Sequence, residues 1–525
     1  MTIRSPYPDV AIPEVSLFEF LFGGGFGDHA GTPALIDGGT GATLRYAELG
    51  GLVLKVAAAL AARRVGAGDV VALFAPNSPL WVAAFHGALR ANATVMTANS
   101  LSTPSELGHQ LRDSGARQLI TVSAFLDRAS AAAKAAGLAD DAVVLLDEAP
   151  GYASLRGLLA AAGEPPPLRV GPADPAVLPY SSGTTGLAKG VVLTHRNLVA
   201  NLRQVDATAR ISPGTKLLAV LPFFHIYGMT VMMNAGINKR STVVTMPKFD
   251  LPEFLRVISQ YRVQRVYIAP PIAVALAKHP AVDRYDLSCV EVIVSGAAPL
   301  AAELGHAVAK RLGCVVLQGY GMTELSPVSH TIPDDRPDID LDSVGVALPN
   351  IACKLVDPAT GREVGPGGRG ELWVKGPNVM ARYLNDPEAT AATLDADGYL
   401  HTGDVATVTE DGVFTIVDRV KELIKYKGYQ VPPAELEALL LTHDEIADVA
   451  VIGVRDGETE EEVPKAFVVR QPGAALGAEE VIAFVAERVA PYKKVRAVEF
   501  LDQIPKSAAG KILRNVLRAR QAAAT

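Results

Sequence analysis

Residues 180–190 constrain this chain more than any other stretch. They hold three glycines, four Ser/Thr hydroxyls and one lysine between two apolar runs. Glycines let successive backbone N–H groups turn inward on a small anion, while the hydroxyls and the lysine add donors and charge. We therefore interpret this stretch as a phosphate-binding loop, called the phosphate loop below. The alternative is a flexible hairpin connection rich in turn residues.

The phosphate loop does not match the Walker pattern. Ala188 stands five positions after Gly183, and Lys189 is followed by Gly190. Residues 191–194 are then typical of a strand, whereas the Walker motif leads into a helix. A nucleotide is still the first ligand to expect, held by a loop of another kind.

Length and charge limit the remaining possibilities. A chain of 525 residues is too long for one compact core and should divide into two or three units. Hydrophobic residues make up 49% and charged residues 20%, which is a globular composition. A formal net charge of -7 leaves no basic surplus to neutralise a phosphate backbone, so we expect no nucleic-acid partner.

Cysteine usage and hydropathy favour the cytoplasm. The N-terminal residues 1–8 carry two prolines and no apolar core, so we expect no signal peptide. No uninterrupted apolar stretch reaches the 18 or more residues of a membrane span, so we expect no membrane partner. The cysteines are odd in number and widely spaced, which suggests neither a disulfide framework nor a zinc site: Cys289, Cys314 and Cys353.

Hydrophobic patterning predicts an α/β fold with two styles of sheet. Apolar runs at 70–74, 217–221 and 290–294 alternate with helix-length segments such as 54–64, which is typical of buried parallel strands. After about Gly345 apolar and polar residues alternate between turns, which indicates antiparallel strands with one solvated face. Roughly the last hundred residues predict a small α+β unit, with helices at 433–441 and 479–489. Residues 334–340 are predicted to form a polar loop.

Four further clusters combine glycine with reactive side chains. Residues 318–324 offer an aromatic face, two glycines and a carboxylate that suits Mg²⁺, although a structural turn fits equally well. Residues 401–404 end in a carboxylate suited to ribose hydroxyls, with an ordinary polar turn as the alternative. Residues 418–430 hold four basic residues around one glycine, where a solvated charged turn is the alternative. Residues 505–511 put a lysine on a Gly/Ser-rich turn, which is otherwise typical of solubilising surface.

Taken in this order, the clusters resemble the adenylate-forming superfamily over nearly the whole chain. Within it they look most like the 4-coumarate:CoA ligases, a group that includes cinnamate:CoA ligases. The segments that carry the resemblance are SSGTTGLAKGV, LPFFHIYGM, VSGAAPL, GYGMTELSPV, HTGD, DRVKELIKYKGYQV and PKSAAGKILR. Such enzymes make an acyl-adenylate from a carboxylate and ATP with Mg²⁺, then pass the acyl group to coenzyme A.

The resemblance implies a division of the chain. Residues 1–419 would form a large N-terminal domain with two α/β sheets and a distorted β-barrel. Residues 422–525 would form a small, mobile α+β domain, and the hinge maps near Lys421. The chain departs from the family in two places: Ala188 replaces a frequent proline, and residues 370–376 lack the cysteine of plant members.

The resemblance also assigns roles to individual residues. Nucleotide binding is implied for Ser181, Ser182, Gly183, Thr184, Thr185, Gly186, Lys189, Gly296, Ala297, Ala298, Gln318, Gly319, Tyr320, Gly321, Thr323, Asp404 and Arg419. Glu324 would hold Mg²⁺, and Lys511 would bridge the α-phosphate and the carboxylate. Lys425 and Gln430 would steady the adenylate, while Lys427 and Gly428 would line the route of pantetheine.

The acyl site follows from the same resemblance. His225 would act as a gate near the reacting carboxyl, although a satisfied core histidine is the alternative from the residues alone. The pocket would be lined by Tyr227, Val231, Gly296, Gly321, Pro327 and Val328, whose alternative is ordinary turn and core packing. Val231 stands where plant relatives often have a serine that can meet a para-hydroxyl, so we expect cinnamate to be accepted at least comparably to 4-coumarate.

Several alternatives stay open at this level. An amino-acid-activating domain is disfavoured, because no acid follows the Phe-rich segment before Asp250. A fatty acyl-CoA synthetase or a luciferase-like oxygenase would share the scaffold, although the C-terminus lacks the peroxisomal tripeptide of beetle luciferases. A nucleotide sensor without turnover is the remaining class. The expected partners are a small carboxylic acid, ATP and CoA, with the protein a monomer or homodimer. The choice among cinnamate, 4-coumarate and caffeate stays open.

Overall fold

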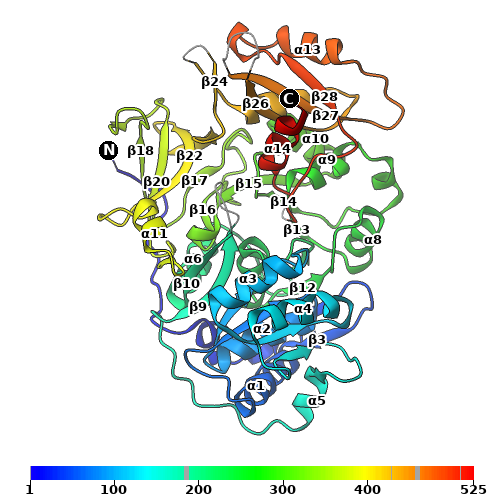
Figure 1. Ribbon diagram of the computed structural model, residues 1–525, viewed down its shortest axis with the longest axis vertical. Helices are drawn as coiled ribbons and strands as arrows, with labels where there is room; N and C mark the ends of the chain where they lie inside the picture. The colour runs from blue at the N-terminus through cyan, green and yellow to red at the C-terminus, as the bar shows by residue number, and fades with distance from the viewer. Residues whose placement is uncertain (1, 182–187, 427–428, 456–461, 509, 525) are drawn as a thin grey trace.

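The computed structural model describes residues 2–181, 188–426, 429–455, 462–508 and 510–524, with the backbone alone for 429–430 and 523–524. Two large sheets with helices packed on them make up most of the molecule, and a smaller lobe built on a third sheet lies at one end (Figure 1). The α/β architecture expected from the sequence is confirmed. Among the described residues, no helix combines the length and the apolar character needed to cross a membrane.

The first sheet has eight strands, in the order β21-β10-β9-β5-β4-β6-β7-β8. Its central strands are parallel, as expected for runs that are buried on both faces, and β4 is buried at all five positions. β9 and β10 are antiparallel neighbours, and the phosphate loop joins them. The strands are β4 (Val70–Phe74), β5 (Thr94–Thr97), β6 (Ala116–Thr121), β7 (Val143–Leu145), β8 (Ala153–Ser154), β9 (Pro175–Ser181), β10 (Lys189–Thr194) and β21 (Arg382–Tyr383).

The second sheet joins parallel and antiparallel strands in one hydrogen-bonded array. Its order is β1-β18-β20-β22-β23-β17-β16-β15-β14-β13-β11-β12-β2-β3, with β19 paired to β18. The strands are β1 (Ile3–Arg4), β2 (Pro33–Asp37), β3 (Thr43–Arg45), β11 (Lys216–Ala219), β12 (Thr242–Thr245), β13 (Arg265–Ile268), β14 (Val292–Ser295), β15 (Val315–Gly321), β16 (Val328–Thr331), β17 (Gly345–Ala347), β18 (Ala352–Val356), β19 (Glu363–Val364), β20 (Gly370–Lys375), β22 (Leu400–Val408) and β23 (Val413–Arg419).

The change of strand direction comes earlier than the sequence pattern indicated. Beyond the parallel strands β11 to β15, the antiparallel part of this sheet begins between β15 and β16, which the 3₁₀ turn η6 (Thr323–Leu325) connects, and not near Gly345. β16 is only four residues long and half of it is buried, so it shows no clear alternation. The prediction of antiparallel strands further along is confirmed for β18, β20, β22 and β23.

Helices cover the sheets, and their ends follow from local chemistry. In α3, the Thr103 hydroxyl accepts the Glu106 N–H while the Glu106 carboxylate accepts the Thr103 N–H, and Gly115 ends the helix at φ 64°. The helices are α1 (Tyr46–Ala62), α2 (Pro79–Arg90), α3 (Pro104–Ser114), α4 (Leu126–Ala136), α5 (Leu155–Ala160), α6 (His195–Asp206), α7 (Ala235–Asn238), α8 (Leu251–Tyr261), α9 (Pro270–Lys278), α10 (Ala302–Leu312) and α11 (Pro387–Thr393). Short 3₁₀ or π turns are η1 (Glu19–Gly23), η2 (Gly27–His29), η3 (Ser123–Phe125), η4 (Tyr227–Asn234) and η5 (Pro280–Arg284).

The C-terminal lobe has its own hydrophobic clusters, built from residues 424–517. In its main sheet β26 and β27 are antiparallel and β28 is parallel to β27. The expected helix at 433–441 matches α12. The elements are β24 (Ile424–Tyr426), β25 (Tyr429–Val431), α12 (Pro433–Leu441), β26 (Ile446–Arg455), β27 (Glu462–Arg470), α13 (Ala478–Ala486), η7 (Pro491–Lys493), β28 (Ala497–Phe500) and α14 (Arg514–Ala524). A division of the chain near Lys421 stays a prediction.

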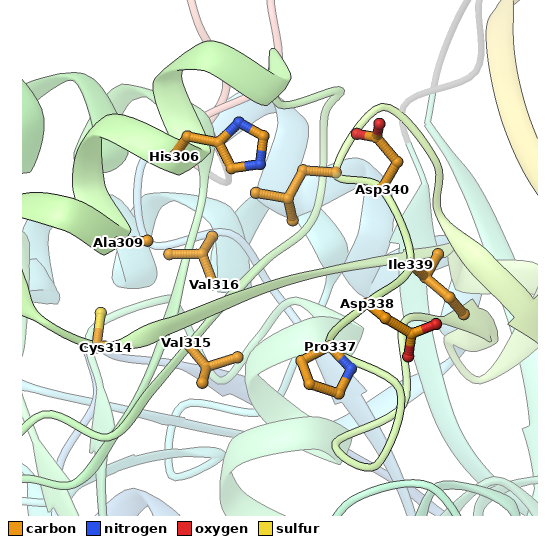
Figure 2. Close-up of a pocket in the computed structure, with 10 residues that line it drawn as sticks. His306, Ala309, Cys314, Val315, Val316, Pro337, Asp338, Ile339 and Asp340 are labelled. Carbon is orange, nitrogen blue, oxygen red and sulfur yellow. The ribbon is translucent and has the colours of Figure 1, made fainter.

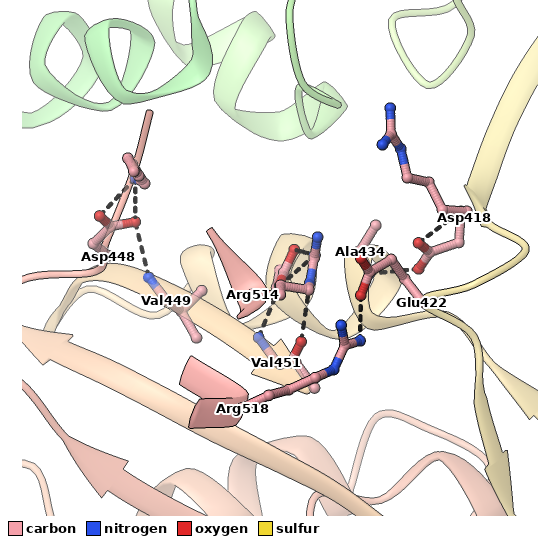
Figure 3. A network of polar contacts seen from close by, with 11 residues as sticks. Asp418, Glu422, Ala434, Asp448, Val449, Val451, Arg514 and Arg518 are labelled. Atoms are coloured by element: carbon pink, nitrogen blue, oxygen red, sulfur yellow. Dashed lines mark hydrogen bonds and ion pairs between the residues drawn. The ribbon is translucent and has the colours of Figure 1, made fainter. Parts of the chain in front are cut away.

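A polar network ties this lobe to the end of β23 (Figure 3). The Asp418 carboxylate accepts the backbone N–H of Ala434 at 3.1 Å, in the first turn of α12, and burial raises the pKa of Asp418 to about 6. Within the lobe, Arg514 donates two 2.7 Å hydrogen bonds to the buried carboxylate of Glu437. The helix α12 is therefore held from β23 on one side and from α14 on the other.

Gly345 offers a direct test of the join between β16 and β17. It has φ 77°, and a Cβ there would lie 2.0 Å from the carbonyl oxygen of Thr331. Gly361 has a similar φ of 69° with nothing within 4 Å of a Cβ, so Gly361→Ala is the matched control. We expect the control to lose about 1–2 kcal/mol of stability and Gly345→Ala to lose more than about 3 kcal/mol, because the backbone clash adds to the left-handed strain. Urea unfolding midpoints measure both, and equal losses would contradict the observed packing.

Candidate active site

Three of the predicted nucleotide-binding residues, one each from β15, β22 and β23, meet through their side chains. The Tyr320 hydroxyl donates to one oxygen of Asp404 at 2.6 Å, and Arg419 Nε lies 3.1 Å from the other. Asp404 and Arg419 are register partners on adjacent strands, which fixes their spacing. Asp404 is only 4% exposed, so the hydrogen bond from Tyr320 and the ion pair with Arg419 compensate for the loss of water around its carboxylate.

Glu324 stands at the beginning of the phosphate loop. Its Oε1 accepts hydrogen bonds from Ser181 Oγ at 3.1 Å and from the Tyr383 hydroxyl at 2.9 Å. Ser181 is the last residue of β9, so the carboxylate of Glu324 lies beside the point where the loop leaves the sheet. The next predicted loop residues lie outside the described part of the chain: Ser182, Gly183, Thr184, Thr185 and Gly186.

Lys189 marks the other end of the loop. Its Nζ lies 3.3 Å from Asp386 Oδ2 and 5.3 Å from the centre of the Tyr383 ring. Sequence reasoning missed both Tyr383 and Asp386, because neither belongs to a glycine-rich cluster. Tyr383 reaches the site through the pairing of β21 with β10, which no local pattern reveals.

Lys511 brings the C-terminal lobe into the same group of charges. Burial lowers the pKa of Lys511 to about 8, Arg419 acts in the same direction, and Asp404, Glu422 and Glu324 oppose them. Burial, helped by the charge of Lys511, lowers the pKa of His225 to about 4. The turn that carries Lys511 packs on the start of α9, where a Cβ on Gly510 would lie 3.0 Å from that of Ala269. The turn that carries Lys511 therefore contacts the large N-terminal part of the chain at the start of α9.

Some of the predicted acyl-site residues lie on or against the π-helix η4. Tyr227 donates its backbone N–H to His225 Nδ1 at 3.3 Å and its hydroxyl to the Val294 carbonyl at 3.2 Å. A Cβ on Gly296 would lie 3.1–3.2 Å from the Tyr227 ring, so only glycine fits without moving that ring. Val231 is 6% exposed on the same π-helix.

The three other acyl-site residues flank η6: Gly321 ends β15, Pro327 follows η6, and Val328 begins β16. A Cβ on Gly321 would lie 2.0 Å from the Pro327 carbonyl oxygen, so the backbones of these residues are in close contact. The side chain of Asn201 in α6 binds Val328 twice, accepting its N–H at 3.2 Å and donating to its carbonyl at 2.7 Å. The position of this turn is therefore set by the backbone and by Asn201.

Some predicted residues are engaged in packing. The Gln318 side chain exchanges two 3.1 Å hydrogen bonds with the backbone of Leu300, so it holds the 296–300 turn in place. Ala297, on that turn, adopts φ 71°, an uncommon conformation for a residue with a Cβ. Lys425 is exposed on β24, which packs against β26 and β27. Lys427, Gly428 and the side chain of Gln430 lie outside the described part of the chain.

Other predicted residues lie within the site region. Thr323 is buried in η6 next to Glu324, and Gly319 lies on β15 next to Tyr320. Ala298 follows Ala297 on the 296–300 turn. The role of each stays a prediction.

A separate cavity of about 360 Å³ lies between α10 and the 337–341 loop (Figure 2). His306 from α10 and Asp340 from the loop face it, and Cys314 lies at its edge. None of the predicted nucleotide or acyl residues lines it. Its loop is connected to the site through Gln318, whose Nε2 also donates to the Leu341 carbonyl.

Family comparisons agree with the geometry. The AMP-binding enzyme model matches residues 26–384, and the model of the AMP-binding enzyme C-terminal domain matches residues 435–511. The fold and the site together define an adenylate-forming enzyme. The chain belongs to the AMP-binding enzyme family.

Individual relatives are similar over almost their whole length. The 4-coumarate–CoA ligase 3 of Oryza sativa subsp. japonica is 42% identical, covering 100% of this chain and 95% of the relative. The ATP-bound crystal structure of MatB from Rhodopseudomonas palustris has a TM-score of 0.87 at 30% identity, covering 97% of this chain and 99% of that one. A benzoate CoA ligase from Burkholderia xenovorans LB400 has a TM-score of 0.87 at 26% identity, covering 96% and 99%. The resemblance inferred from the sequence is confirmed.

Proposed function

We propose that this enzyme activates a phenylpropenoic acid, cinnamate or 4-coumarate, with ATP and transfers the acyl group to coenzyme A. The broader activity, an AMP-forming acid–CoA ligase, follows from the family and from relatives about 41% identical over the full chain. The acid is the part that we propose. Its class rests on the 4-coumarate–CoA ligases among the relatives and on the apolar and aromatic side chains around η4.

The adenylation step of this proposal rests on the contact of the Lys511 turn with the start of α9 and on the charges that act on Lys511. Attack of a carboxylate on the α-phosphorus of ATP brings two anions together, so the transition state requires fixed positive charge. Lys511 shares the field of Arg419, Asp404 and Glu324, and it also acts on His225. The first half-reaction needs a cation between the predicted nucleotide-binding residues and the predicted acyl-site residues. Its burial strengthens each of these interactions.

The nucleotide would lie across the residues already described. Tyr320 and the 296–298 turn would hold the adenine, Asp404 and Arg419 the ribose, and Ser181, Thr323 and Lys189 with the remaining phosphate-loop residues the phosphates. An aromatic ring beside small residues has the right shape for a flat base. The Tyr320–Asp404 hydrogen bond supports this arrangement, because it orients the carboxylate that would meet the ribose hydroxyls.

Glu324 is the residue that would hold Mg²⁺. The carboxylate is 5% exposed and lies at the start of the phosphate loop. In the described part of the chain no group of three or more His, Cys, Asp or Glu side chains could hold an ion. A single carboxylate beside Ser181 fits Mg²⁺, which is commonly bound by one or two carboxylates together with substrate phosphates. Bound there, the ion would offset phosphate charge.

Transfer to CoA would use a second arrangement of the two domains. We propose that the C-terminal domain turns about Lys421, withdraws Lys511 and brings Lys427 and Gly428 to the pantetheine route. Lys425 and Gln430 would steady the adenylate. The free cysteines suit a reducing compartment such as the cytoplasm, and we retain the monomer or homodimer as the expected state.

A panel of carboxylic acids tests the proposed substrate. CoA-thioester formation from phenylpropenoic, benzoic, fatty and amino acids should be highest in kcat/KM for a phenylpropenoic acid. A preference for a fatty acid or an amino acid would overturn the assignment. Absence of pyrophosphate release with every acid would favour a nucleotide sensor.

Asp404→Asn tests the ribose contact. The substitution keeps the size of the side chain but removes the charge that pairs with Arg419. A ribose contact is made in both ground and transition states, so we expect the KM for ATP to rise by roughly tenfold or more, while the KM for the acid stays within about twofold. Asp395→Asn, on the loop before β22, is the control. A change in acid selectivity with unchanged ATP dependence would place Asp404 elsewhere.

Lys511 makes adenylate formation depend on pH. The proposed step needs the charged lysine, and its pKa of about 8 lies below the usual value for lysine. We therefore expect kcat/KM for ATP to fall as pH rises through about 8, because free enzyme then loses the proton. Acid-dependent release of pyrophosphate, measured as a function of pH, checks this decline.

Two variants separate this effect from general loss of structure. Lys511→Ala should abolish adenylate formation but largely spare thioester formation from a supplied acyl-adenylate. Lys506→Arg, a charge-conserving change on the same turn, should keep the pH limb of the wild type. Equal loss of both half-reactions in Lys511→Ala would remove the lysine from the proposed step.

Val231 tests the acyl pocket. Valine offers no hydrogen bond to a para-hydroxyl, so we expect cinnamate to be used at least comparably to 4-coumarate and Val231→Ser to shift the kcat/KM ratio toward 4-coumarate. An unpaired buried hydroxyl costs about 1–3 kcal/mol, which corresponds to a shift of roughly five- to 150-fold. Val231→Ala controls for lost volume. A wild type that favours 4-coumarate by more than about tenfold, or an unmoved ratio in Val231→Ser, would show that Val231 is simply core.

A further inference from the structure

A buried ion pair lies behind the predicted acyl site. Arg265, the first residue of β13, donates from Nη1 and Nη2 to the two carboxylate oxygens of Asp334 at 2.7 and 2.9 Å. The two side chains are 7% and 9% exposed. This two-pronged geometry is the strong form of an arginine–carboxylate contact, and it fixes the plane of the guanidinium group.

The carboxylate of Asp334 is anchored on its far side as well. It accepts the backbone N–H of Arg210 at 2.8 Å, and its own N–H donates to the Thr208 carbonyl at 3.0 Å. The sequence pattern predicts a polar loop at 334–340. Its first residue, Asp334, is nevertheless buried, because these contacts hold its side chain and backbone against the protein. The ion pair is therefore held by backbone groups as well as by its two side chains.

The third donor of Arg265 points to a tyrosine on the same strand. Arg265 Nε donates to the Tyr267 hydroxyl at 3.0 Å. Burial raises the pKa of Tyr267, with Arg265 opposing it, so the hydroxyl stays neutral. The ring of Tyr267 is thus fixed at its hydroxyl end by a guanidinium group that cannot rotate.

Tyr267 in turn contacts the predicted wall of the acyl site. Its ring meets that of Tyr227 edge to face, with centroids 6.3 Å apart and planes at 82°. Tyr267 is the register partner of Val294, whose carbonyl accepts the Tyr227 hydroxyl. Tyr227 is therefore held by β13 and β14 at once, with its ring against Gly296.

We propose that Arg265, Asp334 and Tyr267 are positioning residues that fix the ring of Tyr227 and thereby set the width of the acyl site at Gly296. This inference rests on the proposed function in one respect, the assignment of Tyr227 to the acyl wall. The three residues do not contact the acid. They act through Tyr227, and a shift of a few tenths of an ångström in its ring changes the space beside Gly296.

Tyr267→Phe is the decisive single substitution, because it keeps the ring and removes only the oxygen that Arg265 holds. We expect the KM for the acid to rise by between about two- and tenfold, the range of one hydrogen bond, while kcat and the KM for ATP stay within about twofold. The assay uses the acid with the highest kcat/KM in the panel. Equal changes in the two KM values would show a merely structural role and overturn the proposal.

Arg265→Gln with a matched surface control extends the test. Arg262 forms a single-donor pair with Asp286 at 2.6 Å, with both side chains more than half exposed, so Arg262→Gln should change neither KM. Arg265→Gln should raise the acid KM at least as much as Tyr267→Phe. If it does not fold, because Asp334 is left buried without its partner, Tyr267→Phe still decides the question.

A double variant measures the coupling directly. In the wild type, an added methyl in Gly296→Ala meets a fixed Tyr227 ring, so we expect kcat/KM for the acid to fall by about tenfold. When Tyr267→Phe has released that ring, the same methyl should cost about threefold or less. Independent effects that multiply would overturn the proposal.

The outcomes also separate this inference from the proposed substrate. If the preferred acid in the panel is not a phenylpropenoic acid, the proposed substrate is wrong, but the coupling between positions 267 and 296 still decides the inference. If a phenylpropenoic acid is preferred and the two substitutions act independently, the substrate stands and the positioning network does not.

Discussion

Charge around Lys511 is the constraint on which the rest of the structure depends. A lysine near the C-terminus loses hydration on burial, which lowers its pKa to about 8, and the carboxylates of Asp404 and Glu324 partly restore it. Those carboxylates come from β22 and from the turn after β15, and Arg419 ends β23. The long second sheet therefore serves to bring distant segments to one point, and the C-terminal lobe completes that point from outside.

Rigid support of the site comes from hydrogen bonds to the backbone. Gln318 holds the 296–300 turn through Leu300, and Asn201 holds the turn at Val328 in the same way. Each amide side chain satisfies both a donor and an acceptor of an irregular segment, which would otherwise carry unpaired buried groups. A site built from turns can then be as well ordered as the strands that end in it.

Much of this arrangement could be predicted from local sequence. The strand at 70–74 and the helix at 433–441 match the observed bounds, because burial on both faces and a proline at a helix start are local signals. The glycine-rich clusters likewise led to Tyr320, Glu324, Asp404 and Lys511. Tyr383 and Asp386 could not be found in this way, because they join the site only through the pairing of β21 with β10.

The same limit explains why the sequence predicts Asp334 only as part of a polar loop. The sequence shows that the neighbours of Asp334 are polar. It does not show that Asp334 forms an ion pair with Arg265 on the buried strand β13. Replacing such a pair by apolar residues is often neutral for stability, so stability alone does not explain why charge is placed there. Orientation does, because a guanidinium group fixed on two carboxylate oxygens can hold a tyrosine hydroxyl at a set distance, whereas apolar contacts would let the ring slide. The proposed recognition of a flat acid would depend on that kind of fixed wall.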